Sequence, residues 1–439
     1  MLAQSVAYNA AGRVGGLAVG FASSVLLARW LGPADRGLLG VLTTATGFGM
    51  VLFGFGIPTA VTYLASIMRG ATATIFGTTI SVAAALAVVL VPTTWAASSL
   101  LADAFTGGEG AVYWPFAAAL VSLTFLDWTT HNQLIAQLRF AFFNALTLVA
   151  RIAALVATVA FVGLLGWGVT GGLAATGLLS VVMIAGAVPT LLRTGGRPRF
   201  DLDVLRRLAR YGVRVQAGSA LQSLNYRLDL MLLGVFRPLD EVGSYFVASF
   251  MAELVLTVSQ SFELVPLVSR AETDAGRNAT TVSAIRHHQI LAFAATLGNL
   301  VFGPIVILGL MGNGYRDALL PFFILLVGMI PAGTGTVAGS DLRGRNRPGT
   351  ASLYAGIALV VTVVGDLALI PPFGPVGAAV VSVLAYTLYS VVSVRGLARL
   401  TGNSWRELAV PTAAEVGLYL RLLQGLARNR LRRSRREAT

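Results

Sequence analysis

Cysteine and lysine are both absent from the 439 residues of this sequence, and each absence excludes a class of chemistry. Without cysteine there is no disulfide, no thiolate metal site and no thiol nucleophile. All 32 basic residues are arginine, so the chain lacks both the lysine of an ATP-binding P-loop and an amine for Schiff-base chemistry. Any energy source must therefore be an ion gradient, a substrate gradient or a partner protein.

Charge is also scarce, because charged residues make up 12% of the chain and apolar residues 56%, whereas a soluble domain carries about 25% charged residues. The apolar runs are long and continuous, which favours helices, since backbone groups in lipid must bond within their own segment. No cleavable signal peptide is expected, because the first apolar run leads directly into further ones. The arginines behind the net charge of +13 lie mainly in short loops and the tail, which indicates membrane topology and not nucleic-acid binding.

The sequence thus predicts an all-α polytopic membrane protein. Alternate loops between the apolar runs differ in their arginine content. One set contains only Arg36, Arg237 and Arg316, whereas the other set is rich in arginine. Arginine-rich loops stay in the cytoplasm, so we expect both termini, which lie on that side, to be cytoplasmic. A window of about 20 apolar residues predicts about twelve spans, near residues 8–31, 38–65, 73–97, 112–135, 142–164, 168–192, 209–235, 243–266, 288–310, 318–339, 350–370 and 376–397.

The two halves of the chain repeat. The proline and aspartate of the turn Gly32–Gly37 recur in the turn 237–243 at an offset of 205 residues, and Gly168–Gly171 recurs as Gly374–Gly377 at an offset of 206. Six spans is an even number, so the repeats run parallel about an axis along the membrane normal. The predicted organisation is an N-terminal six-helix lobe with a basic linker (1–200), a C-terminal six-helix lobe (201–400) and a basic cytoplasmic tail (401–439).

Several arginines lie inside the predicted spans, where each costs about 2.5–3.5 kcal/mol on insertion scales and needs a reason. Arg13 lies early in the first span and Arg151 lies in the fifth, about nine residues from its cytoplasmic end. Either one could bind phosphate oxygens through its planar guanidinium. The alternatives are snorkelling to the interface and pairing with an acid on another span.

The seventh span is the most polar. At about 100° per residue, one arc holds Arg214, Gly218, Gln222, Asn225 and Asp229, and a roughly opposite arc holds Gln216, Ser219, Ser223 and Arg227. A lipid-facing helix could not carry both arcs, so one should face a cavity and the other a neighbouring helix. We expect the Arg214 arc to face the cavity. The alternative role of these residues is interhelical hydrogen bonding, with Asp229 as a counter-ion for Arg227 or Arg13.

Acidic residues inside the spans are candidates for ion coupling. Asp127 and His131 lie one turn apart on the fourth span and could form a proton-sensing pair, while Glu253 and Asp366 are lone intramembrane acids. The alternative is local capping or pairing. No zinc motif and no Ser/His/Asp set occurs, so we expect a protein that is not an enzyme and uses no metal and no cofactor.

Residues 412–436 form an amphipathic basic stretch, with Leu418 and Leu422 on one face and Arg421 and Arg428 on another. Such a stretch is expected to lie on the anionic cytoplasmic leaflet. The alternative is docking to a glycosyltransferase.

The opening "GRVGGLAVGFASSVLLARWLGPADRGLLGVLTTA" and the later stretches "NYRLDLMLLGVF", "ELVPLVSRAE" and "IPPFGPVGAAVVSVLAYTLYSVV" resemble polysaccharide exporters of the multidrug/oligosaccharidyl-lipid/polysaccharide superfamily. The resemblance runs from about residue 8 to 397 and includes the plan of twelve spans in two lobes. Arg13 falls where the lipid II flippases of the superfamily also place an arginine in a similar context. Those MurJ-type flippases usually carry two further spans, which this sequence lacks.

This resemblance implies a Wzx-type flippase of the bacterial inner membrane, which moves a polyprenyl-pyrophosphate-linked oligosaccharide by alternating access. The implied partners are the lipid-linked sugar and membrane lipids, together with the glycosyltransferases and polymerase of the same pathway as candidates, and the expected state is a monomer. The alternative is a cation-coupled exporter of small drugs from the same superfamily. An exporter of that kind should have a cavity dominated by acids and aromatics, and a flippase should have one that contains arginine.

Overall fold

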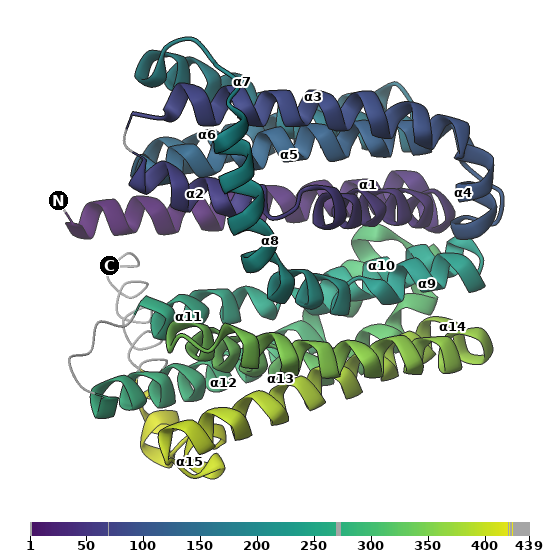
Figure 1. Cartoon of the computed structure of the whole chain (residues 1–439). Helices are drawn as coiled ribbons and strands as arrows, with labels where there is room; N and C mark the ends of the chain where they lie inside the picture. The colour runs from purple at the N-terminus through teal and green to yellow at the C-terminus, as the bar shows by residue number, and fades with distance from the viewer. Residues whose placement is uncertain (1, 69, 269–273, 420, 422–423, 425–439) are drawn as a thin grey trace, which may run out of the picture. The chain divides into compact units, whose positions relative to one another are not determined.

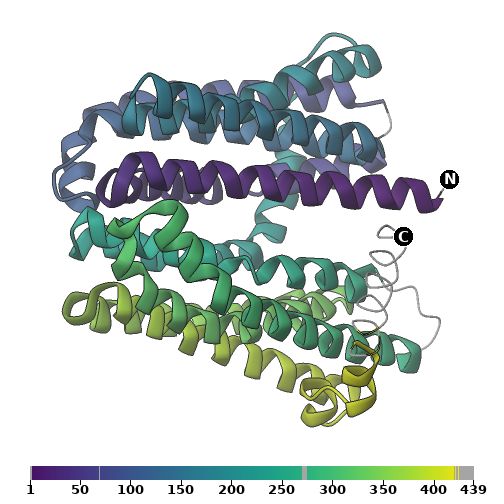
Figure 2. The same ribbon diagram turned by 180° about the vertical axis from the view of Figure 1, so that it is seen from behind.

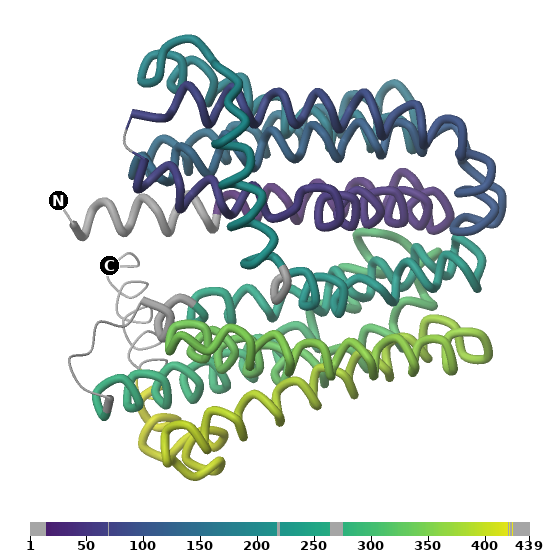
Figure 3. The backbone as a smooth tube through the Cα atoms, viewed as in Figure 1, coloured from purple at the N-terminus to yellow at the C-terminus, as the bar shows by residue number. Residues whose placement is uncertain are grey.

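The computed structural model describes residues 2–68, 70–268, 274–419, 421 and 424, and Figure 3 draws in grey the residues whose placement is uncertain. Side chains at 2–14, 217–219, 264–268 and 274 are likewise outside the described part. The described residues are almost entirely helical and include no strand. The α-helices are α1 (Leu2–Phe53), α2 (Ile57–Ile67), α3 (Thr72–Ala96), α4 (Ser98–Phe105), α5 (Trp114–Ala136), α6 (Phe140–Ala157), α7 (Gly168–Gly195), α8 (Leu202–Asn225), α9 (Leu228–Phe236), α10 (Leu239–Glu253), α11 (Leu256–Val268), α12 (Asp274–Pro304), α13 (Leu319–Gly344), α14 (Pro348–Thr401) and α15 (Trp405–Ala409).

Four short helical segments complete the set. Two are π-helices that continue α6 and α12 and carry each of them further along its axis, and two are 3₁₀ turns that precede α5 and α13. They are η1 (Ala111–Tyr113), η2 (Thr158–Leu164), η3 (Ile305–Met311) and η4 (Asn313–Ala318).

The long helix α1 is a hairpin of two arms. Its backbone leaves helical geometry at Gly32, whose φ is 74° and ψ 176°, and Pro33 opens the second arm. A φ in this range is favourable only for glycine, and proline suits the first turn of a helix because its missing N–H has no partner there. Arg36 Nη2 donates a hydrogen bond of 3.1 Å back to Ser24 Oγ, so the two arms lie side by side.

The long helix α14 repeats this design. It breaks at Gly374 (φ 54°, ψ −133°), which Pro371, Pro372 and Pro375 surround. An added Cβ on Gly365, before the break, would contact Val381, after it, so the two arms pack against each other here as well. The predicted reversals between spans 8–31 and 38–65 and between spans 350–370 and 376–397 therefore fall at these two breaks. The predicted span 38–65 is itself interrupted at residues 54–56, between α1 and α2.

Eight helices are long and apolar enough to span a membrane among the described residues, or nine if the pair Leu239–Glu253 and Leu256–Glu263, bent by 47°, counts as one span. The chain is thus a multi-pass helical membrane protein. Large apolar side chains point outward over these helices, as lipid contact requires, for example Val88 at 73% exposed and Leu164 at 79%. The number of twelve spans stays a prediction, because the polar α8 does not meet this criterion.

The described residues form two compact units. The first comprises 1–250, 304–322 and 359–381, and the second the described parts of 251–303, 323–358 and 382–439. In the first unit α1, α3, α5 and α7 run alongside one another, as Figure 1 and the reverse view in Figure 2 show. The division into lobes at residue 200 stays a prediction.

The start of α8 is fixed in the first unit by a cap and a small core. Asp201 Oδ1 accepts hydrogen bonds from the backbone N–H groups of Asp203 and Val204, which satisfies donors that the first helical turn leaves open. Leu208 of α8 is fully buried with Ile57 and Val61 of α2. These contacts hold α8 across α2 and α3 (Figure 1) and thereby set which of its faces points toward the pocket described below.

The two turns of the sequence repeat contact each other within the first unit. An added Cβ on Gly37 would collide with the carbonyl oxygen of Leu239, and one on Gly243 would collide with that of Pro33. Backbone therefore packs directly on backbone in a reciprocal pair of contacts. Gly168 and Gly374, matched in the repeat, share a φ of 54°. These geometries agree with the predicted duplication.

The segment after α14 packs in the second unit. Arg286 Nε of α12 donates to the carbonyl oxygen of Glu407 at 2.7 Å, and Arg286 Nη1 lies 3.5 Å from Glu415 Oε1. Partial burial raises the pKa of Glu415, but the hydrogen bonds from Thr412 and the ion pair with Arg286 outweigh this and lower it below its ordinary value. Of the predicted surface helix 412–436, residues 420, 422–423 and 425–436 lie outside the described residues.

Candidate functional site

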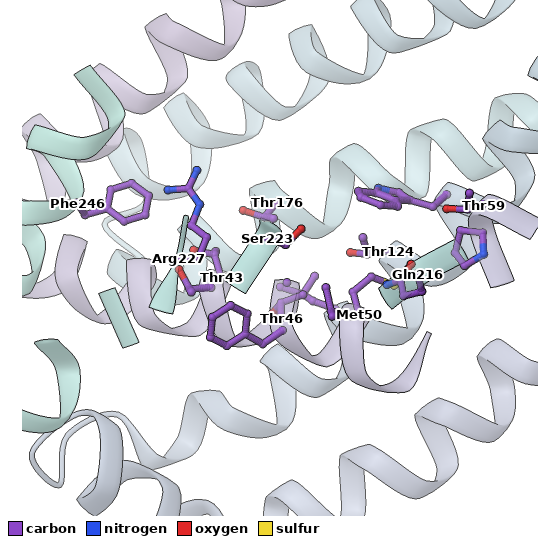
Figure 4. A pocket seen from close by; sticks show the side chains of 17 residues that line it. Thr43, Thr46, Met50, Thr59, Thr124, Thr176, Gln216, Ser223, Arg227 and Phe246 are labelled. Atoms are coloured by element: carbon purple, nitrogen blue, oxygen red, sulfur yellow. The ribbon is translucent and has the colours of Figure 1, made fainter. Parts of the chain in front are cut away.

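The first unit contains a pocket of about 680 Å³, here called the threonine pocket because Thr43, Thr44, Thr46, Thr59, Thr124 and Thr176 line it. Its walls come from α1, α2, α5, α7, α8 and α10 and from Arg227, which lies between α8 and α9. Figure 4 shows its labelled side chains arranged from Phe246 and Arg227 at one end to Gln216 and Thr59 at the other. The lining combines many hydroxyl groups with one arginine and has no carboxylate.

Arg227 reaches this pocket because it stands at the break between α8 and α9. The chain leaves regular helix there, and Arg227 takes the N-cap position of α9 with φ −136°. Its side chain is half-buried and points into the pocket near Thr176 and Ser223 (Figure 4). An arginine in such a position can donate two parallel hydrogen bonds to a phosphate group.

The polar arc that lines the threonine pocket differs from the one we expected. Gln216, Ser223 and Arg227 line it, and these residues belong to the arc opposite Arg214. The packing of α8 on α2 explains the difference, because an added Cβ on Gly212 would collide with backbone of Phe55 and Gly56, which fixes the rotation of the helix.

The members of the Arg214 arc lie elsewhere. The Arg214 side chain is exposed and does not line this pocket, and Gln222 is half-buried, with its Nε2 lacking a partner. Asn225 and Asp229 are buried against neighbouring helices of the same unit. Gly218 of this arc lies outside the described side chains, and so does Ser219 of the opposite arc.

Asp229 and Asp366 form a buried acid pair. Tyr245 donates a hydrogen bond to Asp229 Oδ2, and the N–H of Leu230 donates one of 2.7 Å to Oδ1. Asp366 is fully buried, both of its oxygens lack a hydrogen-bond partner, and it interacts electrostatically with Asp229. Asp366 is thus a buried carboxylate without a hydrogen-bond partner, next to a second carboxylate. A charge is costly in such surroundings, so Asp366 requires a proton or a bound cation.

The same cluster contains a second polar contact. Thr362, one helical turn before Asp366, donates a hydrogen bond of 2.5 Å to Asn225 Oδ1, and Asn225 Nδ2 has no partner. The structure therefore brings Asn225, Asp229 and Asp366 together. Spacing within the seventh span could not reveal this, because it gives no information on which residues of other spans lie opposite.

A second pocket of about 460 Å³ in the same unit, here called the arginine pocket, is lined by both Arg36 and Arg151. Asp127 and His131 also line it, so the predicted pair does face one cavity. Asp127 Oδ2 accepts a hydrogen bond of 3.1 Å from Ser180, and His131 packs on Phe143 with ring centroids 4.2 Å apart. No hydrogen bond joins these two described side chains to each other.

The remaining candidates are less well defined. The Arg13 side chain lies outside the described residues, so its role stays a prediction. Glu253 is half-buried and ends α10 at the bend before α11, in the second unit.

Arg36 is not among the candidates from sequence, because its place in a loop between two predicted spans indicates topology only. Its side chain is in fact only 5% exposed. The one signal in the sequence that could have indicated it was its place in the repeated turn.

Comparisons with known proteins agree with this architecture. A MurJ lipid II flippase in an inward closed conformation has a TM-score of 0.76 with 12% identity, covering 91% of this chain and 88% of that one. An inward-facing multidrug resistance MATE transporter of the MOP superfamily has a TM-score of 0.73 with 14% identity, covering 89% of this chain and 98% of that one. At these identities the likeness establishes a common fold.

Sequence comparison gives the family. A Haloferax volcanii protein named "Probable low-salt glycan biosynthesis flippase Agl15" is 26% identical over 170 residues, which are 38% of this chain and 36% of that protein. The match thus spans about a third of that relative. The model of the family described as "Polysaccharide biosynthesis protein" matches residues 26–320. Because this family model matches most of its length, the chain belongs to the polysaccharide biosynthesis protein family.

Proposed function

We propose that the protein is a flippase that moves a polyprenyl-pyrophosphate-linked oligosaccharide across the membrane by alternating access. The observation that carries this proposal is the lining of the threonine pocket, which offers Arg227 and many hydroxyl groups and no acid. The arginine suits phosphate oxygens and the hydroxyl groups suit a sugar. Membership of the polysaccharide biosynthesis family and the flippase named among its relatives support the same cargo.

A cation-coupled drug exporter of the same fold is the alternative. An exporter of cationic drugs needs carboxylates or an aromatic cage in its cavity. The lining of the threonine pocket includes three aromatic side chains, Phe48, Trp128 and Phe246, but no carboxylate. Its charge therefore favours an anionic headgroup.

The cargo is tested with purified protein in liposomes that contain a fluorescent polyprenyl-pyrophosphate disaccharide. We expect the lipid to move between leaflets at least tenfold faster than in protein-free liposomes, measured by quenching of the accessible fluorophore. A fluorescent phospholipid without a sugar serves as the control and should not be accelerated. Movement no faster than in protein-free liposomes under every imposed ion gradient would falsify the flippase proposal.

We further propose that Asp229 and Asp366 bind the coupling cation or proton. Both are buried, they interact with each other, and Asp366 has no hydrogen-bond partner. Protonation or cation binding would remove their repulsion and so change the packing of α9 against α14. Binding at this pair is thus able to favour one conformation of the transporter over another.

We also propose, from the arginine distribution, that the protein lies in the bacterial inner membrane with both termini in the cytoplasm. The natural absence of cysteine allows a direct test. Arg316 and Arg139 are both exposed and lie in loops of opposite predicted sides. We expect Arg316→Cys to react with a membrane-impermeant maleimide in spheroplasts, and Arg139→Cys to react only after permeabilisation. The reverse pattern would invert the topology, and the wild-type chain, which cannot react, is the background control.

A further inference from the structure

The arginine pocket contains two arginines, Arg36 and Arg151, that form no ion pair with any described residue. Arg151 Nη1 donates a hydrogen bond of 2.6 Å to the carbonyl oxygen of Gly16. An added Cβ on Gly20 would lie 3.3 Å from the same nitrogen, so the guanidinium rests on a stretch of α1 where glycine provides the space. Among the described residues no carboxylate lies within ion-pairing distance of Arg151.

Arg36 has a similar lack of counter-charge. Its Nη2 donates to Ser24, its guanidinium carbon lies 4.2 Å from the centroid of the Phe246 ring, and its Nε is buried without a partner. Within the described part of the chain it too has no carboxylate at ion-pairing distance. A buried cation without an anion is costly. Arg36 is buried and Arg151 is half-buried, so two arginines without an ion pair in one pocket point to a ligand that brings negative charge.

The arginine pocket adjoins the threonine pocket. Trp128 and Thr176 line both pockets, and Arg36, which lines one, stacks on Phe246, which lines the other. Figure 4 shows Thr176 and Phe246 among the side chains that line the threonine pocket. A ligand whose phosphate is bound by Arg227 can therefore extend past Trp128 toward Arg36 and Arg151.

The shared wall is suited to a sugar ring. Trp128 is 52% exposed, and its ring face can stack on the C–H groups of a pyranose, which carry partial positive charge. Next to it, Asp127 holds Ser180 through one oxygen, and its other oxygen, Oδ1, is buried without a partner. That oxygen can accept a hydrogen bond from a sugar hydroxyl. Because the single carboxylate of Asp127 faces two arginines, the pocket keeps a net positive charge.

From these observations we infer that the arginine pocket is a subsite for an acidic sugar, in which Trp128 stacks on the ring, Asp127 accepts a hydroxyl, and Arg36 and Arg151 bind the carboxylate. This inference rests on the proposed function and specifies its substrate class as a repeat unit that contains a uronic acid or a similar sugar acid. A neutral sugar would leave both arginines without an anion, and a phosphate alone would make no use of Trp128 or Asp127.

The subsite is tested by equilibrium binding to the full-length protein in nanodiscs, with two polyprenyl-pyrophosphate probes that end in glucuronic acid or in glucose. The wild-type protein should bind the acidic probe at least tenfold more tightly. Arg36→Gln and Arg151→Gln should each bring the ratio of the two affinities close to one, and Arg151→Lys should restore part of it. Trp128→Ala should weaken both probes by a similar factor and keep the ratio.

Arg139→Gln is the matched control, because it removes an exposed arginine that lines neither pocket, and it should leave the ratio unchanged. Equal affinity of the wild-type protein for the two probes overturns the subsite, as does an unchanged ratio in both glutamine variants. Preferential binding of the acidic probe without movement of either probe in liposomes overturns the flippase and leaves the subsite standing.

Discussion

Replacing Arg227 with glutamine should abolish or strongly reduce export of the lipid-linked sugar while the folded protein stays in the membrane. A hydrogen bond to a charged group contributes about 1.5–3 kcal/mol, which corresponds to a roughly tenfold to hundredfold loss of transport rate. Arg227→Lys should recover only part of the rate, because lysine keeps the charge and loses the planar fork. The measurement is surface polysaccharide in a deletion strain, normalised to the level of the protein.

Arg214→Gln and Arg193→Gln provide the comparison for this result. Arg214 lies on α8, the helix that precedes Arg227, and is exposed outside the threonine pocket. Arg193 lies in the last turn of α7. We expect both to complement the deletion strain close to the wild-type level. If Arg227→Gln complements as well as they do, the phosphate must be bound elsewhere, with Arg13 as the next candidate.

Replacing Asp366 with asparagine should uncouple transport from its driving ion. The amide cannot take up a proton or balance a cation, so an imposed gradient should no longer accelerate movement of the lipid in liposomes. Asp229→Asn should have the same effect, because the two acids interact. Asp240→Asn, which alters an exposed acid in the first turn of α10, should keep the full response to the gradient.

Thermal stability separates uncoupling from misfolding in this experiment. Asp366→Asn removes a buried carboxylate whose two oxygens have no partner, so the midpoint of thermal unfolding in detergent should stay equal or rise. A lower midpoint together with lost transport would indicate a structural role. An undiminished response to every gradient in both asparagine variants would place ion coupling at another acid, such as Glu253.

The sequence was sufficient to predict a helical membrane protein and the positions of its two hairpin turns, because both depend on local chemistry. Apolar runs and the motifs around Gly32 and Gly374 identify where helices lie and where they reverse. Periodicity also separates the two polar arcs of the seventh span. It cannot decide which arc faces the threonine pocket, since both arcs are polar and the answer depends on how Gly212 packs against Gly56.

The acid pair and the arginine pocket were beyond sequence for a related reason. Asp229 and Asp366 are 137 residues apart, and only tertiary packing brings α9 next to this arm of α14. Arg36 looks like a loop arginine because it follows a Gly-Pro turn, but the hairpin buries it between Ser24 and Phe246. Burial of a turn residue by a distant helix leaves no trace in the local pattern.

The reciprocal contact of the turns that contain Gly37 and Gly243 has the form of an isologous interface, in which the same surface occurs on both sides. A six-helix chain that carried one such turn could form a homodimer through this contact, and gene fusion would keep the contact within one chain. Fusion also frees each copy to diverge. Arg36 corresponds to Glu241 at the repeat offset of 205. Arg36 lines the arginine pocket, whereas Glu241 forms an ion pair of 2.8 Å with Arg237. In a homodimer both subunits would carry the same residue, so a cation on one side and an acid on the other became available only after the two halves shared one chain.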